Sequence, residues 1–170
     1  MDKPNSLANH EKKELTYKEY IRSRFTNTVV LAREMINALG KKQAHEIISN
    51  AFYKDMEEMV KKELQELGQV RSFKDFIKME KEENESPEFR NIISLTYPHE
   101  SITELSLHIT KCLYAEVFKE LKAEELGYLM VCNPDHAYAQ TCHPQIKLRR
   151  SKTLMQGDSY CDHKWHWEEE

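Results

Sequence analysis

The cysteine and histidine side chains of this chain are crowded toward its C-terminus. All four cysteines, and every histidine except His10 and His45, lie at His99 or beyond. Thiol and imidazole groups are the side chains best suited to nucleophilic attack, proton transfer or metal binding near neutral pH. The first half of the chain has no cysteine and shows the pattern of amphipathic helices. We therefore expect the chemistry in the C-terminal half and a scaffold in the N-terminal half.

The final run of alternating residues, 159–167, predicts a strand. Alternation places Cys161, His163 and Trp165 on one face of that strand and the residues between them on the other. Cys161 and His163 are then neighbours, spaced to hold a metal ion or to form a thiolate–imidazole pair. The alternative is a half-buried edge strand in which Cys161 is a small core residue.

Cys112 lies where a predicted strand becomes a predicted helix. With Thr110 as the N-cap, Cys112 would occupy the first helical turn, where free N–H groups and the helix dipole lower a thiol pKa. The same N–H groups can hold an oxyanion. The alternative is a buried cysteine that packs beneath the helix.

Cys132 opens a tight polar turn that contains Asp135 and His136. Asp135 could orient an imidazole or act as a general base, although Asn, Pro and Asp are also common in turns for backbone reasons. Arg149 and Arg150 follow one another on a strand, so they should point to opposite faces. One of them could bind a substrate carboxylate, and the alternative is a solvated basic edge. No paired C-x-x-C spacing is present, so the pattern gives only weak support to a metal site.

Three N-terminal helices are expected to form the scaffold. Apolar residues recur at spacings of three and four from Tyr17 to Gly40 and again from Ala44 to Gly68, and both glycines are expected to end their helices. Ser72 can cap a short third helix. The charged stretch 78–87 breaks the pattern and indicates a solvated connection.

The hydrophobic period changes from that of a helix to that of a strand after Pro87. The expected elements are strands at 93–97 and 105–110 joined by a turn at 98–101, helices at 111–122 and 123–131, and a hairpin of strands 146–155 and 159–167 turning at 156–158. The pattern predicts an α+β fold, with N-terminal helices packed on a small, mainly antiparallel sheet of about four strands.

Composition limits the class of protein. The chain has 170 residues, of which 39% are hydrophobic and 32% charged, and this suits one domain over 17–167 behind a flexible segment 1–16. The net charge of −4 gives no reason to expect a nucleic-acid partner. The polar start and the lack of a long apolar run predict no signal peptide and no membrane contact. We expect a cytoplasmic protein with free thiols.

Several spaced landmarks resemble the L-2-amino-thiazoline-4-carboxylic acid hydrolase family over roughly residues 17–167. They are His108–Cys112, Glu124–Gly127, Cys132–Asp135, Leu148–Arg150 with Thr153 and Leu154, and Gly157–Asp162. The resemblance implies a ring-opening hydrolase that acts on a C–N bond of a cyclic amidine, and the matching positions are Cys112, Cys132, Asp135, Cys161 and Asp162. His163 stands where the family often has an aromatic residue.

In such an enzyme Cys112 would attack the amidine carbon, and helix N-terminal amides would hold the developing charge. Asp135 would manage protons, directly or through His136 or His163. Arg149 or Arg150 would hold the substrate carboxylate. The only expected partner is the small-molecule substrate, with no metal and no cofactor.

Two other functions fit the same residues. One is a metal-binding protein in which Cys132, Cys161 and His163 are ligands and Asp135 is a possible fourth. The other is a non-catalytic domain that senses a small ligand in the same pocket.

Overall fold

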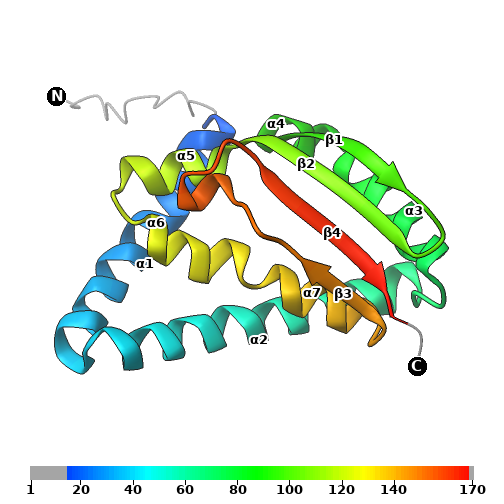
Figure 1. Cartoon of the computed structure of the whole chain (residues 1–170). Helices are drawn as coiled ribbons and strands as arrows, with labels where there is room; N and C mark the ends of the chain where they lie inside the picture. The colour runs from blue at the N-terminus through cyan, green and yellow to red at the C-terminus, as the bar shows by residue number, and fades with distance from the viewer. Residues whose placement is uncertain (1–14, 169–170) are drawn as a thin grey trace, which may run out of the picture.

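The computed structural model describes residues 15–168. The elements in chain order are α1 (Tyr17–Leu39), α2 (Lys41–Leu67), α3 (Phe73–Asn84), α4 (Pro87–Ile92), β1 (Ile93–Glu100), β2 (Glu104–Cys112), α5 (Leu113–Glu120), α6 (Glu124–Gly127), the π-helix η1 (Tyr128–Cys132), α7 (Asp135–Cys142), β3 (Ile146–Arg149), the 3-10 helix η2 (Leu154–Gln156) and β4 (Cys161–Trp167) (Figure 1). The expected flexible segment 1–16 lies outside the described residues except for its last two residues.

Helices α1 and α2 start and stop where their sequences supply caps. Thr16 accepts a hydrogen bond from the backbone of Glu19, whose side chain caps Thr16 in return. Gly40 ends α1 with a φ of 81°, and its N–H bonds to the Ile36 carbonyl at 2.9 Å. A positive φ favours glycine because it has no Cβ. The predicted ends at Gly40 and Gly68 are confirmed.

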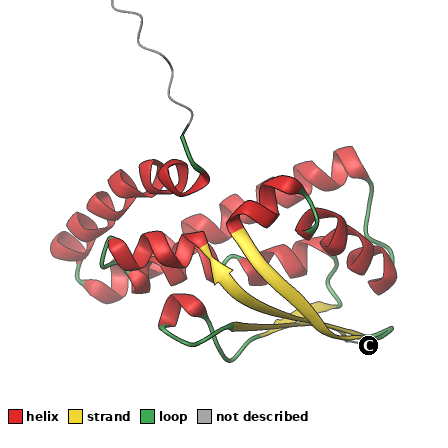
Figure 2. Cartoon of the chain, turned by 90° about the horizontal axis from the view of Figure 1, so that it is seen from above, coloured by secondary structure: helices red, strands yellow, loops and turns green. Residues whose placement is uncertain are grey.

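The sheet has four strands in the order β1-β2-β4-β3, and every neighbouring pair is antiparallel. The predicted α+β fold is therefore confirmed. Figure 2 shows the helices gathered mainly on one side of this sheet. The sheet residues Leu105, Leu107 and Trp165 form a buried cluster with Phe73 and Phe76 of α3. The segment from α6 through η1 to α7 packs along α2 and places α7 against β3 (Figure 1).

The expected solvated connection at 78–87 is wrong. Residues up to Asn84 continue α3, and Pro87 opens the short helix α4. Glu80 and Asn84 are buried, and the Asn84 amide donates to the Glu80 carboxyl at 3.4 Å. The sequence pattern failed here because it counts every charged residue as exposed, whereas these two polar groups partner each other within the core.

The expected strand 146–155 is shorter than predicted. It ends at Arg149, and the chain then turns away because the Asp162 carboxylate accepts the N–H groups of Ser151 and Lys152 at 2.9 and 2.6 Å. Thr153 then caps η2. The antiparallel pairing of β3 and β4 is confirmed, but the long loop 150–160 joins them in place of the expected tight turn at 156–158.

Three other boundaries also differ from the prediction. Strand β1 continues through the expected turn to Glu100, and β2 continues to Cys112, so α5 begins two residues late. The expected helix 123–131 is divided into α6 and η1. Within residues 15–168, no helix combines the length and apolarity that a bilayer crossing requires.

Glu80 supplies a test of this packing. Burial raises the pKa of its carboxyl to about 8, so the folded protein holds this proton more tightly than the unfolded chain does. The contribution of protonated Glu80 to the free energy of unfolding is therefore present at low pH and is lost as the pH rises from about 4.5 to 8. We expect the unfolding free energy of Glu80→Gln to rise relative to that of the wild type by about 3–5 kcal/mol as the pH increases from 5 to 8. Urea unfolding at each pH measures this difference.

Glu82→Gln is the matched control for this experiment. Glu82 lies on the same helix with 68% of its side chain exposed and forms an ion pair with Lys78 at 3.7 Å. Its removal should leave the pH dependence of stability unchanged within about 0.5 kcal/mol. Parallel stability curves for Glu80→Gln and the wild type would show that Glu80 is ionised in the folded state.

Candidate functional site

Arg150 is the centre of the site. Its side chain is 2% exposed, and its Nη1 donates to an Asp135 carboxylate oxygen at 2.6 Å. The same nitrogen lies 3.0 Å from His163 Nε2, and Nη2 donates to the Cys132 carbonyl at 2.9 Å. We call Arg150, Asp135, His163 and the Cys132 carbonyl the Arg150 centre. It joins residues from three segments that are separate in the sequence.

Local structure explains how these groups meet. Cys132 ends η1, and Asp135 begins α7, so the break at Asn133 and Pro134 brings the Cys132 carbonyl and the Asp135 carboxylate to the same place. A carboxylate at a helix N-terminus is also stabilised by the helix dipole. π-Helical turns occur frequently at functional sites.

The two adjacent arginines point in different directions, as strand alternation predicts. Arg150 is buried, whereas the Arg149 side chain is 66% exposed and pairs with Glu168 at 3.2 Å. Arg149 therefore lies apart from the Arg150 centre. Arg150 makes its contacts within the centre through Nη1 and Nη2, and because a guanidinium has five N–H donors, it can still donate to a substrate carboxylate.

The charges of the centre are balanced at neutral pH. Burial raises the pKa of Asp135 to about 6, and Arg150 opposes that rise, so the carboxylate is mostly ionised at pH 7. Burial and the charge of Arg150 lower the pKa of His163 to about 3. His163 is thus neutral, with Nε2 accepting from Arg150, and its hydrogen is on Nδ1. It is held as a hydrogen-bond acceptor.

Cys112 is the N-cap residue of α5, which corrects the expectation that Thr110 holds this position. The pKa of its thiol is raised to about 11 because burial outweighs the stabilising backbone N–H groups of Ala115 and Tyr114. The expected lowering of this pKa is therefore wrong. The helix amides act in the predicted direction, but they are weaker than the loss of solvation.

Cys132 and Cys161 have the same response to burial. Burial raises the pKa of both thiols, whereas the charge of Arg150 lowers each of them. The Leu154 N–H also points at the Cys161 sulfur, at 3.2 Å. Cys112, Cys132 and Leu154 pack against the same hydrophobic cluster, and the Leu154 N–H contacts the Cys161 sulfur.

Cys142 lies elsewhere. It is buried beside Tyr138 and Glu80, where burial raises its pKa to about 12. It thus provides a thiol of similar burial that does not touch the Arg150 centre.

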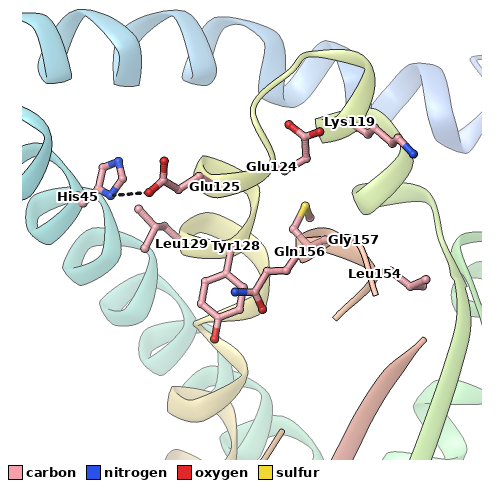
Figure 3. Close-up of a pocket in the computed structure, with 10 residues that line it drawn as sticks. His45, Lys119, Glu124, Glu125, Tyr128, Leu129, Leu154, Gln156 and Gly157 are labelled. Carbon is pink, nitrogen blue, oxygen red and sulfur yellow. Dashed lines mark ion pairs between the residues drawn. The ribbon is translucent and has the colours of Figure 1, made fainter. Parts of the chain in front are cut away.

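Sequence reasoning assigned no role to two residues beside the site, Tyr128 and the family landmark Leu154. The Tyr128 ring lies under the Arg150 guanidinium, 5.5 Å from its central carbon, and Leu154 is the donor to Cys161. Both also line a pocket of about 510 Å³ beside the centre (Figure 3). No spacing marks Tyr128, because a π-helix has no periodic sequence signature and the arginine that it contacts lies in a distant segment.

The geometry does not favour the expected metal alternative. Among residues 15–168, no three His, Cys, Asp or Glu side chains are grouped so that they could hold a metal ion. The Arg150 guanidinium also contacts both His163 and Asp135, so a positive charge already occupies the space between two of the proposed ligands.

Comparison with known proteins identifies the family. Residues 19–165 match the family described as L-2-amino-thiazoline-4-carboxylic acid hydrolase. The chain belongs to this family. The match includes every residue of the Arg150 centre and the cysteines Cys112, Cys132 and Cys161, and it confirms the family resemblance noted from the sequence. Comparison with curated proteins found no match to this chain.

Two solved structures share the fold of this hydrolase-family protein. One is a trafficking protein particle complex subunit 3 from Naegleria fowleri covalently bound to palmitic acid, with 13% identity and a TM-score of 0.53 over 88% of this chain and 96% of that one. The other is the phenol-responsive sensory domain of the transcription activator PoxR with phenol, with 12% identity and a TM-score of 0.50 over 83% and 73%. At these identities the likeness concerns the fold alone.

The neighbouring arginines allow a paired test of the centre. Arg150→Met leaves the Asp135 carboxylate without its partner, so we expect a loss of about 3 kcal/mol in unfolding free energy at pH 8. The loss should be smaller at pH 5, because Asp135 can then take up a proton. Arg149→Met removes only an exposed ion pair and should cost less than about 1 kcal/mol at either pH. Equal losses in the two variants, measured by urea unfolding, would contradict the assigned role of Arg150.

Proposed function

We propose that the protein is a ring-opening hydrolase of a cyclic amidine such as L-2-amino-thiazoline-4-carboxylate, with a cysteine nucleophile. One observation carries the proposal. The family match contains an ion pair between the buried Arg150 side chain and the partly exposed Asp135 carboxylate, together with the thiols of Cys112, Cys132 and Cys161. This arrangement supplies a nucleophile and a proton acceptor together, which are the two groups that ring opening requires.

Cys112 is the thiol that we assign as the nucleophile. Its position at the N-cap of α5 exposes it to the N–H groups of Ala115 and Tyr114, which lower its pKa although burial dominates. The same groups can stabilise charge that develops on an adding substrate. Because the free thiol is protonated at neutral pH, the attack needs a base.

Asp135 is the base that the centre provides. It is ionised above about pH 6, and Arg150 fixes the carboxylate in place. His163 is less suited to the role, because its Nε2 already accepts a hydrogen bond from Arg150 and its pKa is about 3. In this proposal His163 positions Arg150, and Arg150 positions Asp135.

The reaction can then be written in balanced steps. The Cys112 sulfur adds to the amidine carbon while its proton passes to Asp135. The ring C–N bond breaks, and the departing nitrogen becomes a primary amine by taking that proton and one proton from the exocyclic amino group, which is left as an imine on the carbon bound to Cys112. Water adds to the carbon that remains bound to sulfur and gives a proton to Asp135. Cleavage of the bond between this carbon and the Cys112 sulfur then releases the open-chain carbamoyl product. The proton returns from Asp135 to the Cys112 sulfur. The four free thiols fit a reducing, cytoplasmic setting for this chemistry.

A second candidate function is a non-catalytic domain that binds a small ligand. The specific observation is the shared fold with a sensory domain that holds phenol and with a subunit that holds palmitic acid covalently. Such a domain would need the pocket and the thiols but no turnover. Saturable binding of the thiazoline without release of a ring-opened product, followed by NMR, would favour this candidate.

The nucleophile assignment predicts a difference between cysteines. Cys112→Ala should reduce kcat for ring opening of the thiazoline by about 1000-fold or more, because no other group forms the covalent bond. Cys142→Ala should leave kcat within a factor of about three, since Cys142 lies beside Glu80 and apart from the centre. Melting curves on both variants control for folding. Full activity in Cys112→Ala would exclude Cys112 as the nucleophile.

The proton-transfer assignment predicts a pH profile. Because Asp135 must be ionised to accept the thiol proton, kcat/KM should fall about tenfold for each pH unit below its pKa of about 6. Asp135→Asn should lose at least about 100-fold in kcat/KM and should lose this acid limb. His136→Gln is a control, since His136 is the adjacent residue and is not assigned as the base. A rate that stays constant from pH 7 to pH 5 in the wild type would refute Asp135 as the base.

A further inference from the structure

The pocket beside the Arg150 centre has features that the proposed hydrolysis does not use. Its volume of about 510 Å³ lies in the range of small-molecule sites. Four parts of the chain form it: α2, the end of α5, the segment of α6 and η1, and the loop around η2 (Figure 3). The lining residues are His45, Lys119, Glu124, Glu125, Tyr128, Leu129, Leu154, Met155, Gln156 and Gly157.

Two opposite charges at this pocket have no partner among residues 15–168. Neither the Lys119 ammonium nor the Glu124 carboxylate makes an ion pair or a hydrogen bond with any residue from 15 to 168. Glu125, by contrast, is occupied by Lys41 at 2.8 Å and lies 3.8 Å from His45. Within the described part of the chain, the pocket thus offers one unpaired cation, Lys119 near the end of α5, and one unpaired anion, Glu124 at the start of α6 (Figure 3).

The rest of the wall is largely apolar. Leu129, Leu154 and Met155 line the pocket together with the Tyr128 ring. A ligand that matches this surface carries both an ammonium and a carboxylate and has an apolar body. That description fits the zwitterion of an α-amino acid with an apolar side chain, because the carboxylate can meet Lys119 and the ammonium can meet Glu124.

The pocket wall is also in contact with the Arg150 centre. Tyr128 lies under the Arg150 guanidinium, and the Leu154 N–H bonds to the Cys161 sulfur at 3.2 Å. A ligand that packs on Tyr128 and Leu154 therefore contacts one residue beside the Arg150 guanidinium and one residue that donates to the Cys161 sulfur. A site and a centre that share wall residues can influence one another in both directions.

We infer that this pocket is a second ligand site, which takes the zwitterion of an apolar α-amino acid and acts on the Arg150 centre through Tyr128 and Leu154. The site is separate from the attack at Cys112 and requires no turnover. Its ligand differs from a cyclic amidine in having a primary ammonium and a larger apolar body.

Three probes of the same shape test the charge requirement. L-phenylalanine carries both charges, 2-phenylethylamine only the ammonium, and 3-phenylpropanoate only the carboxylate. We expect calorimetric titration of the full chain to show that L-phenylalanine binds at least about tenfold more tightly than either other probe, because each of them loses one charged contact. The inference would be overturned if the amine or the acid bound as tightly as L-phenylalanine. It would also be overturned if L-phenylalanine showed no binding up to roughly millimolar concentrations.

Side-chain variants locate the site. Lys119→Gln and Glu124→Gln should each weaken L-phenylalanine binding about five- to tenfold, and both positions are exposed, so folding should be unaffected. Lys111→Gln and Glu88→Gln are matched controls, because both are exposed residues outside the pocket. Equal weakening in a control and in its matched variant would place binding elsewhere and overturn the inference.

The link to the centre has its own readout. Saturating L-phenylalanine should change the rate at which iodoacetamide labels Cys161 at pH 8 by at least about threefold, because the ligand packs on the residue that donates to that sulfur. The labelling rate of Cys142 serves as the internal control. An unchanged Cys161 rate at saturation would overturn the action on the centre. These measurements need no hydrolytic activity, so they can fail or succeed independently of the proposed function.

Discussion

The bond between Arg150 and Asp135 is the contact on which the C-terminal half depends. Arg150 follows β3, Asp135 begins α7, and the same guanidinium reaches His163 on β4 and the carbonyl at the end of η1. One side chain thus fixes the hairpin to the broken helical segment beside it. Because a guanidinium presents its donors in a planar fork, a lysine at this position could not make all of these contacts.

This arrangement also decides which groups carry charge. Burial disfavours every ionised form, so the thiols around the centre stay protonated and His163 stays neutral. Burial also raises the pKa of Asp135, but Arg150 limits the rise to a pKa of about 6, so the carboxylate is mostly ionised at pH 7. Thiols that are protonated at neutral pH and one carboxylate that is mostly ionised therefore occur together in this half of the chain.

Local patterns predicted what local physics controls. Apolar spacing gave α1 and α2 with their glycine ends, and strand alternation separated Arg149 from Arg150. Alternation could not say which arginine is buried, because that depends on the partner Asp135, which lies in another segment. The buried Glu80 and the early end of β3 failed for a similar reason, since each rests on a side-chain contact that hydrophobic periodicity does not record.

The free-energy cost of desolvating the Asp135–Arg150 ion pair bears on the function of the centre. A buried ion pair gains little net stability, because desolvation of both charges offsets most of their attraction, and apolar residues of similar volume often stabilise such a site better. A pocket that only held an apolar ligand would need neither Asp135 nor Arg150. A covalent reaction of a protonated thiol does need a fixed, charged proton acceptor beside it. In the proposed hydrolysis, the charges of the Arg150 centre would therefore have a use that apolar residues at the same positions could not supply.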